Sequence, residues 1–406
     1  MTGTAPFPVA LSLAALLLAS CGGAADTAPP SSANTTPAAT ATPATPATGT
    51  GTAAWNGTLR TQVVGTFDEP WAAAFAPGTQ TLFITEKRGA IRAVDTRTGR
   101  TITVPGAPQV DYGGQGGLGD IAFLPGEAAA TLGTRTIYLS WAEAGAGDTR
   151  GAVVGRGQLV CASDTACRVE NLAVIWRQKP KVTGRGHYSH RIAVSPDERH
   201  LFVASGDRQK MDPAQDNGNT LGTIVRLNLD GTPAAGNPFA GRGSPTDQIW
   251  SFGHRNTLGL AFDADGRLWN MEHGPAGGDE INIVQPGANY GWPVASNGEH
   301  YDGRPIPDHA PGDGFVAPVL TWTPATAPGN MILYRGTLFP GWQGHALLPG
   351  LRSEALIRVA ITGTSAVEAA RFPMNRRLRE LVEAPDGALW LLEDGENARL
   401  LRLTPG

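Results

Sequence analysis

Two clusters of polar residues flank a predicted hairpin within residues 253–292. Residues 258–270 have the pattern of a strand, an Asp-Gly turn and a second strand. The polar residues on either side are His254, Arg255, Asn256, Glu272, His273, Gly274, Pro275, Asp279 and Glu280. A hairpin needs none of these groups in order to fold. A guanidinium, an amide, carboxylates and carbonyl groups freed by glycines suit an anionic ligand and a hard cation side by side.

A histidine and an aspartate stand at the two ends of another predicted hairpin. His187 precedes its first strand and Asp207 follows its second strand. Because neighbouring strands of a hairpin bring their far ends together, Asp207 is expected to approach His187 and fix its tautomer, as a carboxylate does for a general base. A purely structural histidine is the alternative interpretation.

Further polar groups precede two other hairpins. Gln115 lies among five glycines in residues 113–119, which would let the backbone approach a flat ligand, although a flexible turn explains these glycines equally well. Arg377 and Arg379 point to one face of a strand and could receive a carboxylate or phosphate, and a solvated run of charge is the alternative. Together these groups predict an anionic, multiply carboxylated ligand and a proton transfer.

A repeated hairpin must bring these residues together. The pattern of strand, short turn and apolar strand recurs in residues 71–85, 119–139, 191–205, 259–271 and 380–392, and a further copy begins near Pro318. Six copies of three or four short strands predict an all-β, six-bladed β-propeller with four-stranded antiparallel blades. A seventh, divergent blade and a β-sandwich are the alternatives. In a propeller the loops at one end converge on a central channel, where function concentrates.

The composition agrees with an all-β chain. The 406 residues include 53 Gly and 32 Pro, and only 17% are charged, which favours short strands and tight turns over long helices. The formal net charge is −4 and no basic tract occurs, which argues against a nucleic-acid partner.

The first residues predict export. Residues 1–21 resemble a bacterial lipoprotein signal with Cys21 as the lipidated residue, although residues 2–10 lack the usual Lys or Arg. An ordinary cleaved signal is the alternative. Residues 22–54 form an Ala/Thr/Pro linker that cannot bury a core, and residues 55–406 form the propeller domain. The expected location is the periplasm, with membrane contact only through a lipid on Cys21.

Two further cysteines are separated by five intervening residues. In an exported protein, Cys161 and Cys167 predict a small surface disulfide, and two free thiols are the alternative.

The motifs, taken in order, resemble those of the soluble pyrroloquinoline quinone (PQQ)-dependent sugar dehydrogenases, a family of six-bladed propellers. The resemblance spans about residues 60–404 and rests on G-G-Q-G-G-L-G, G-H-x-x-x-R, S-G-D, G-H-R-N-x-x-G-L-A-F, E-H-G-P-x-x-G-D-E-I-N, N-Y-G-W-P and R-x-R-E. The compact chain looks closer to the aldose sugar dehydrogenase branch than to the larger glucose dehydrogenase.

The resemblance implies a role for each matching residue. It makes His187 the general base, oriented by Asp207, with Arg255 polarising the acceptor carbonyl. It implies that PQQ is bound by Gln115, Arg255, Asn256, Arg335, Arg377 and Arg379. It also implies a Ca²⁺ on the carbonyls of Gly274 and Pro275, and a second, structural Ca²⁺ held by Glu280, Tyr290 and a carbonyl near Ser296.

The implied reaction is oxidation of an aldose at its anomeric carbon to the lactone, with hydride transfer to PQQ and electrons passed to a respiratory or dye acceptor. Two alternatives come from other classes. A Ca²⁺-dependent propeller lactonase would have no use for Arg377 and Arg379, and a non-catalytic binding lipoprotein would not need His187 with Asp207. The preferred sugar and the oligomeric state are not readable from the sequence.

Overall fold

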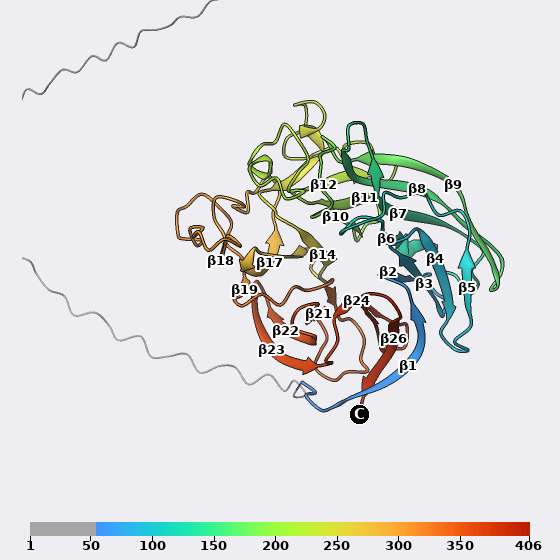
Figure 1. The fold of residues 1–406 in the computed structure, drawn as a ribbon. Coiled ribbons are helices and arrows are strands. Elements are labelled where there is room, and N and C mark those ends of the chain that lie inside the picture. Colours follow the sequence, from blue (N-terminus) through green and yellow to red (C-terminus); the bar gives the residue numbers. More distant parts are fainter. Residues whose placement is uncertain (1–53) are drawn as a thin grey trace, which may run out of the picture. The chain divides into compact units, whose positions relative to one another are not determined.

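Six four-stranded antiparallel sheets are arranged around a central axis in the computed structural model, which describes residues 54–406 (Figure 1). The prediction of an all-β, six-bladed propeller is therefore confirmed, and the alternatives of a seventh blade and a β-sandwich are excluded. The predictions for residues 1–21, for Cys21 and for all but the last residue of the 22–54 linker lie outside the described residues.

The strands follow one another around the ring. Blade 1 contains β2 (Pro70–Phe75), β3 (Thr81–Glu86), β4 (Ala90–Asp95) and β5 (Thr101–Val104). Blade 2 contains β6 (Leu118–Phe123), β7 (Thr134–Ala144), β8 (Arg150–Ser163) and β9 (Ala166–Arg177). Blade 3 contains β10 (Ser189–Val194), β11 (His200–Ser205), β12 (Thr223–Asn228) and β13 (Ile249–Phe252). Blade 4 contains β14 (Thr257–Phe262), β15 (Leu268–Glu272), β17 (Asp279–Val284) and β19 (Leu320–Trp322). Blade 5 contains β20 (Ile332–Leu333), β21 (Ala346–Pro349), β22 (Ala355–Thr362) and β23 (Ser365–Pro373).

Blade 6 closes the ring by combining both ends of the described chain. It contains β24 (Leu378–Glu383), β25 (Leu389–Glu393), β26 (Ala398–Pro405) and the N-terminal strand β1 (Leu59–Phe67), which pairs with β26 in antiparallel register. Backbone hydrogen bonds thus join the first strand of the described chain to its last strand, and Figure 1 shows β1 running beside β26.

The remaining elements are small. A two-stranded ladder joins β16 (Ala276–Gly277) to β18 (Gly298–Glu299), and three short 3₁₀ helices span Pro125–Glu127, Asp212–Gln215 and Thr246–Gln248. Within residues 54–406, no helix has the length and apolar character needed to cross a membrane.

Apolar side chains between neighbouring blades form the core. Tyr138 and Val154 of blade 2 pack with Val203 and Leu227 of blade 3, and all four side chains are fully buried. Burial on both faces explains why a strand such as β25 is apolar almost throughout rather than alternating. Burying each such side chain contributes about 1.5–3 kcal/mol, so the packing between blades dominates the stability of the ring.

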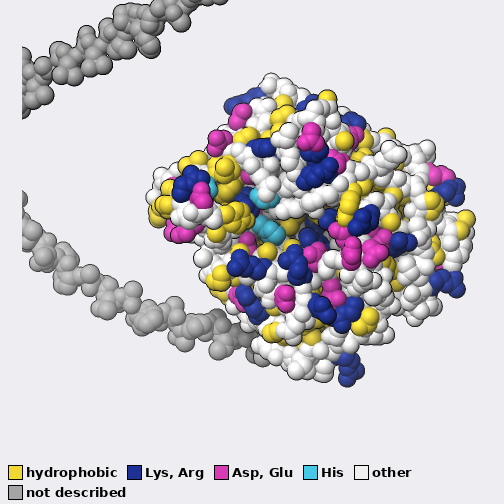
Figure 2. Space-filling model, viewed as in Figure 1, with side chains coloured by type: hydrophobic (Ala, Val, Ile, Leu, Met, Phe, Trp, Pro, Cys, Tyr) yellow, Lys and Arg dark blue, Asp and Glu magenta, His cyan; other side chains and the backbone are white. Residues whose placement is uncertain are grey.

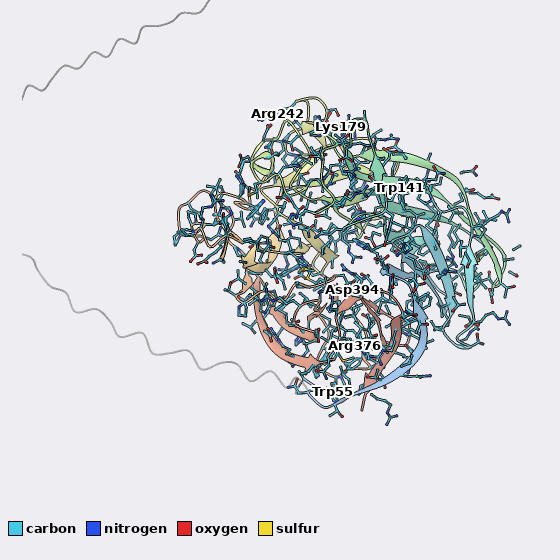
Figure 3. All side chains as sticks on the ribbon, in the orientation of Figure 1. Trp55, Trp141, Lys179, Arg242, Arg376 and Asp394 are labelled. Carbon is cyan, nitrogen blue, oxygen red and sulfur yellow. A yellow bond between two sulfur atoms is a disulfide. The ribbon has the colours of Figure 1, made fainter. Side chains whose placement is uncertain are left out.

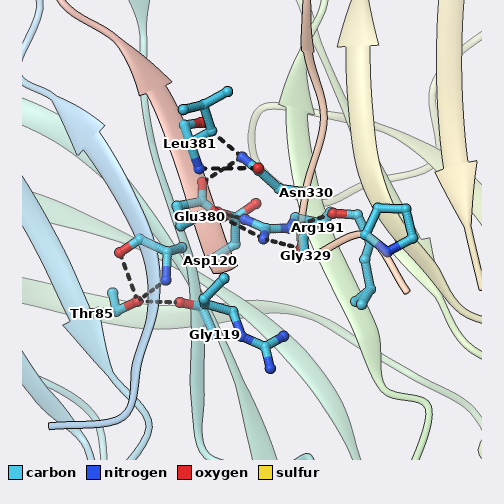
Figure 4. A network of polar contacts seen from close by, with 12 residues as sticks. Thr85, Gly119, Asp120, Arg191, Gly329, Asn330, Glu380 and Leu381 are labelled. Carbon is cyan, nitrogen blue, oxygen red and sulfur yellow. Dashed lines mark hydrogen bonds and ion pairs between the residues drawn. The ribbon is translucent and has the colours of Figure 1, made fainter. Parts of the chain in front are cut away.

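One buried arginine connects all six blades at the axis (Figure 4). Arg191 lies on the innermost strand of blade 3. Its guanidinium contacts the five other blades through the ring of Trp71, the carboxylate of Asp120, the carbonyl groups of Leu258 and Gly329, and the carboxylate of Glu380. The Arg191 Nη2–Glu380 Oε2 distance is 2.6 Å. Burial raises the pKa of Glu380 to about 8 despite this arginine, with Asp120 adding a second negative charge nearby.

The predicted disulfide is present, but it is not at the surface. Cys161 and Cys167 are directly paired across the β8–β9 hairpin and their sulfur atoms are bonded. The two residues are 9% and 5% exposed, because their side chains join the core between blades 1 and 2.

Candidate active site

The hairpins of five blades open in the same way at one end of the ring. In each, a residue on the side of the second strand donates a backbone hydrogen bond to the residue before the first strand. The donor directly follows the second strand in four blades and lies within β7 in blade 2. The donor and acceptor residues are Lys87 and Glu69, Ala142 and Gly117, Gly206 and Tyr188, His273 and Asn256, and Asp394 and Arg377. This repeated geometry delivers side chains from different blades to one place, as the sequence pattern predicted.

A cavity of about 350 Å³ lies where these hairpins open. It is lined by Glu69, Trp71, Lys87, Gly114, Gln115, Tyr188, Ser189, His190, Asn256, Leu258, His273, Ala327, Leu351, Arg377, Arg379, Asp394 and Gly395. Figure 2 shows Lys, Arg and His side chains gathered around the hollow at the centre of this face.

The cavity has an excess of positive charge. Arg377 Nε and Arg379 Nε each lie 2.9 Å from the carboxylate of Asp394, so the two arginines share a face as predicted. Asp394 lies close to the centre of the ring in Figure 3. Lys87 forms a second ion pair, with Glu69 at 3.3 Å. Three cations and two carboxylates give the cavity lining a net positive charge, which favours an anionic ligand. Such a ligand can accept hydrogen bonds from the N–H groups that the ion pairs leave free.

The His187–Asp207 pair follows directly from the strand register of blade 3. Ser189 of β10 is paired with Ser205 of β11, so His187 and Asp207 each lie two residues beyond that pair. His187 Nδ1 is 2.7 Å from Asp207 Oδ1, and Asp207 is completely buried. His187 Nε2 makes no hydrogen bond to any residue of the described part of the chain. The predicted pairing is therefore present, and it leaves Nε2 available to accept a proton.

Four donors surround the carboxylate of Asp207. Oδ1 accepts from His187 and from the backbone N–H of Gln209, and Oδ2 accepts from Trp292 Nε1 and the N–H of Met211. Burial alone would raise the pKa of Asp207, but the hydrogen bonds from His187 and Gln209 outweigh it, so the pKa is lowered. The carboxylate therefore stays ionised and directs the Nδ1 proton of His187.

His187 itself is held neutral. Burial lowers the pKa of His187 below its usual value, and this effect outweighs the stabilising hydrogen bond to Asp207, while Arg255 and Arg208 add to the lowering. A neutral imidazole with its Nδ1 proton on a carboxylate can act as a general base through Nε2.

The amide groups predicted for ligand binding lie beside this pair. Gln115 Oε1 accepts the backbone N–H of His187 at 2.6 Å, and Asn256 Oδ1 accepts the hydroxyl of Ser189 at 3.2 Å. The Nδ2 of Asn256 and the Nε2 of Gln115 have no partner among residues 54–406. Both side chains line the cavity and offer free N–H donors to a ligand.

Arg255 lies between the His–Asp pair and the segment of Gly274. Its Nη1 donates to the carbonyl oxygens of His273, at 3.1 Å, and Gly274, at 2.7 Å, and its Nη2 donates to Tyr301 Oη at 3.2 Å. Arg255 Nε is buried without a hydrogen-bond partner among the residues that the structure describes. The guanidinium thus contacts the Gly274 carbonyl, which the family resemblance implied as a ligand of Ca²⁺.

Two buried carboxylates lie in neighbouring strands beside Arg255. Glu272 and Glu280 are directly paired between β15 and β17 and line a space of about 10 Å³ with Tyr290 and Ser296. Burial and the charge of Glu272 raise the pKa of Glu280 well above its usual value. Like charges directly opposite each other destabilise a sheet, and a hard cation between them would relieve this repulsion.

The predicted ligands of this second ion are only partly arranged for it. The hydroxyl of Tyr290 donates to the carbonyl of Ile283 at 2.7 Å, so a contact from Tyr290 would have to come from its carbonyl group. Within residues 54–406, no three His, Cys, Asp or Glu side chains are grouped so that they could hold a metal ion. A cation here would depend on carbonyl oxygens in addition to carboxylates.

Two of the predicted cofactor ligands, Arg255 and Arg335, do not line the cavity. Arg255 lines the small space beside it, and both spaces share His273 in their walls. Arg335 lines neither space. Its backbone N–H donates to Glu383, and its Nη2 donates to the carbonyl of Phe262, at the end of β14 remote from Asn256. Lys87 lines the cavity but was not predicted from the sequence. It follows the second strand of its hairpin as Asp394 does in blade 6, and this equivalence is the signal that could have identified both residues.

The geometry defines a class of site: a basic central cavity in a propeller, beside a buried histidine that a carboxylate orients. Such an arrangement is able to bind an anionic group and to accept a proton. Comparison with known proteins agrees with this class. The sequence profile described as Glucose / Sorbosone dehydrogenase matches residues 67–402. The chain belongs to this family of PQQ-dependent sugar dehydrogenases and is thus an oxidoreductase of the type that acts on sugars.

Relatives and solved structures extend over most of the chain. The aldose sugar dehydrogenase YliI of Escherichia coli is 36% identical over 83% of this chain and 90% of its own length. Quinoprotein glucose dehydrogenase B of Acinetobacter calcoaceticus is 26% identical, over 82% and 84%. The PQQ-bound aldose sugar dehydrogenase of Streptomyces coelicolor has a TM-score of 0.70 at 29% identity, over 86% of this chain and 98% of its own.

Proposed function

We propose that the chain is a PQQ- and Ca²⁺-dependent dehydrogenase that oxidises aldoses at the anomeric carbon to the lactone. The observation that carries the proposal is the buried His187–Asp207 pair beside a cavity that holds Arg377, Arg379 and Lys87. The PQQ-bound relative, which shares the fold and 29% of its residues, supports the identity of the cofactor.

The residues around the cavity fit PQQ, a planar quinone with three carboxylates. Arg377, Arg379 and Lys87 supply cationic donors, and Gln115 and Asn256 supply amide donors that no described residue occupies. When bound, PQQ would supply the two-electron acceptor for the hydride that leaves the sugar. The protein's own residues bind, orient and move the proton.

His187 would take the proton of the anomeric hydroxyl on Nε2. Asp207 keeps the one N–H proton of the neutral imidazole on Nδ1, so that Nε2 would present a lone pair to the substrate. Arg255 would stabilise negative charge near His187, and its buried Nε, which has no partner among the described residues, supports this role. Loss of the C1 hydride and of the hydroxyl proton together converts the aldose to its lactone.

Calcium is the finer part of the proposal. The carbonyl groups of Gly274 and Pro275 would hold the ion next to the cofactor, which requires Arg255 Nη1 to release the Gly274 oxygen. The paired carboxylates of Glu272 and Glu280 favour a second ion with a structural role, completed by the carbonyl groups near Tyr290 and Ser296.

The residues at the axis of the propeller argue against a lactonase. Such an enzyme would hold its metal on carboxylates and amides in the channel. Here the carboxylates of Asp120 and Glu380 both contact the guanidinium of Arg191, and the amide of Asn330 donates to Glu380.

The test is reconstitution. Purified protein stripped with a chelator is supplied with PQQ and Ca²⁺, separately and together, and reduction of a dye is followed with a panel of aldoses. We expect turnover only with both additions, and His187→Ala should abolish turnover while PQQ still binds. Absence of both PQQ binding and dye reduction across the panel would contradict the proposal, and lactone hydrolysis without dye reduction would favour the lactonase.

The cellular part of the proposal concerns residues outside the described chain. We propose export to the periplasm with a lipid on Cys21, and transfer of electrons to a respiratory acceptor. Metabolic labelling with a radioactive fatty acid should label the wild-type chain and fail to label Cys21→Ser.

A further inference from the structure

His190 is a buried polar side chain in the wall of the cavity, outside the His187–Asp207 pair and the ion pairs around it. It is 1% exposed, it lines the cavity of about 350 Å³, and its ring lies 4.8 Å from the ring of Trp71. Its Nδ1 is buried without a hydrogen-bond partner, and Nε2 forms no hydrogen bond to any residue in 54–406. Buried polar groups normally have partners, so an imidazole with none requires an explanation.

The backbone of His190 adds to the cost. Its φ is +48°, and that of the preceding Ser189 is +57°. Residues with side chains adopt this left-handed conformation at an energetic cost, and glycine adopts it freely. Strain of this kind gathers at functional sites, where the surrounding structure maintains it.

The neighbouring blade 2 has a glycine, Gly119, where the imidazole of His190 lies. A Cβ atom placed on Gly119 would lie 2.1 Å from Cε1 of His190. Gly119 itself does not adopt a left-handed φ, so its backbone conformation does not require glycine. The missing side chain at Gly119 is therefore explained by the space that the imidazole occupies, and two segments 71 residues apart are matched to hold it.

The imidazole is uncharged in this position. Burial, followed by the nearby positive charges of Arg191 and Arg208, lowers the pKa of His190 to about 3. A neutral imidazole carries one N–H donor and one acceptor lone pair. In the protein alone, neither is used by another described residue.

We propose that His190 is a further cofactor-binding residue, whose neutral imidazole forms a hydrogen bond with the polar edge of the planar anionic group in the cavity. This assignment rests on the proposed function and adds a residue to it. The ring is held in contact with the cavity by Trp71 on one side and by the space at Gly119 on the other. It is placed to complete its hydrogen bonding only when the cavity is filled.

The experiment compares two variants of similar size in an equilibrium titration of the apo-protein with PQQ, followed by quenching of tryptophan fluorescence. His190→Leu keeps the bulk of the ring and removes its polar atoms, whereas His190→Gln keeps a donor and an acceptor. We expect the PQQ dissociation constant to rise about fivefold to tenfold in His190→Leu, as for the loss of one hydrogen bond, and to stay within about twofold in His190→Gln. Asn171→Gly, a left-handed position in β9 remote from the cavity, should leave the constant unchanged and controls for relief of backbone strain.

Several outcomes overturn the assignment. Wild-type affinity in His190→Leu, or equal weakening in both variants, would show that the ring only packs. If the variants do not fold, ¹⁵N chemical shifts of the His190 imidazole in the wild-type protein replace them: a shift of one ring nitrogen on addition of PQQ supports the contact, and unchanged shifts refute it. If the wild-type protein itself does not bind PQQ, the proposed function fails and this assignment with it, whereas normal wild-type binding with unchanged His190→Leu refutes His190 alone.

Discussion

The substitution Asp207→Asn tests the proposed base most directly. All four groups around this carboxylate are donors: His187 Nδ1, Trp292 Nε1 and the N–H groups of Gln209 and Met211. An amide has only one acceptor oxygen, so its NH₂ group must face two of these donors in either orientation. Only the imidazole can adapt, by moving its proton to Nε2 and accepting through Nδ1. We therefore expect the asparagine to hold His187 in the tautomer that cannot accept a proton.

The expected magnitudes follow from this geometry. One N–H group, that of Gln209, is left buried without an acceptor, which costs about 1–3 kcal/mol of unfolding free energy. The loss of a correctly oriented base lowers kcat by about 10²–10⁴-fold. The assays are steady-state dye reduction by the reconstituted enzyme and urea denaturation of the apo-protein. The control is Asp265→Asn, an exposed carboxylate in a turn that pairs with Arg267 and should change neither quantity.

Two results would refute this reasoning. A kcat within about threefold of the wild-type value, with the variant folded and PQQ bound, would show that His187 does not depend on Asp207 for catalysis. A large loss of PQQ affinity with an unchanged kcat at saturation would instead place the pair in cofactor binding.

Four further outcomes are expected. Because the folded pKa of His187 is lowered, the base stays neutral below its ordinary pKa, and kcat/KM should remain level down to about pH 6.5 and fall only at more acid pH; a fall that begins above pH 7 would contradict this. Arg379→Ala should weaken PQQ binding about 10–100-fold in a fluorescence titration, while Arg376→Ala, an exposed neighbour outside the cavity lining, should not. Arg191→Met leaves two buried carboxylates without their cation and should cost about 3–5 kcal/mol in urea denaturation. Cys161→Ser should cost about 2 kcal/mol in the same assay, as for a short closed loop, and a wild-type midpoint would show that the disulfide does not stabilise the fold.

The six blades were predictable because the hairpin at the centre of each blade is encoded locally, although blade 6 takes its fourth strand from the other end of the described chain. An apolar strand, a tight turn and a second apolar strand form a hairpin whatever their neighbours are, and the repeat of this unit leaves few architectures open. The His187–Asp207 pair was predictable for the same reason. Both residues belong to one hairpin, and the Ser189–Ser205 register alone places them opposite each other.

Residues contributed by separate blades were harder to predict. Lys87 and Asp394 occupy equivalent positions in blades 1 and 6, yet nothing near either residue in the sequence shows that they face one cavity. Arg335 belongs to blade 5, whose first strand is only two residues long, and the local pattern gave no register that could have excluded it from the site. The space for the imidazole of His190 depends on Gly119, a residue of another blade.

The sequence by itself determined the blades, the residues at each hairpin opening and the histidine–carboxylate pair, because short-range alternation and antiparallel register suffice for all three. The tertiary structure alone decided which openings share a cavity, how Arg191 joins six blades at the axis, and which charges neutralise one another there. The physical reason is that closing the ring, through the pairing of β1 with β26 and the packing between blades, sets distances between residues that no local pattern constrains.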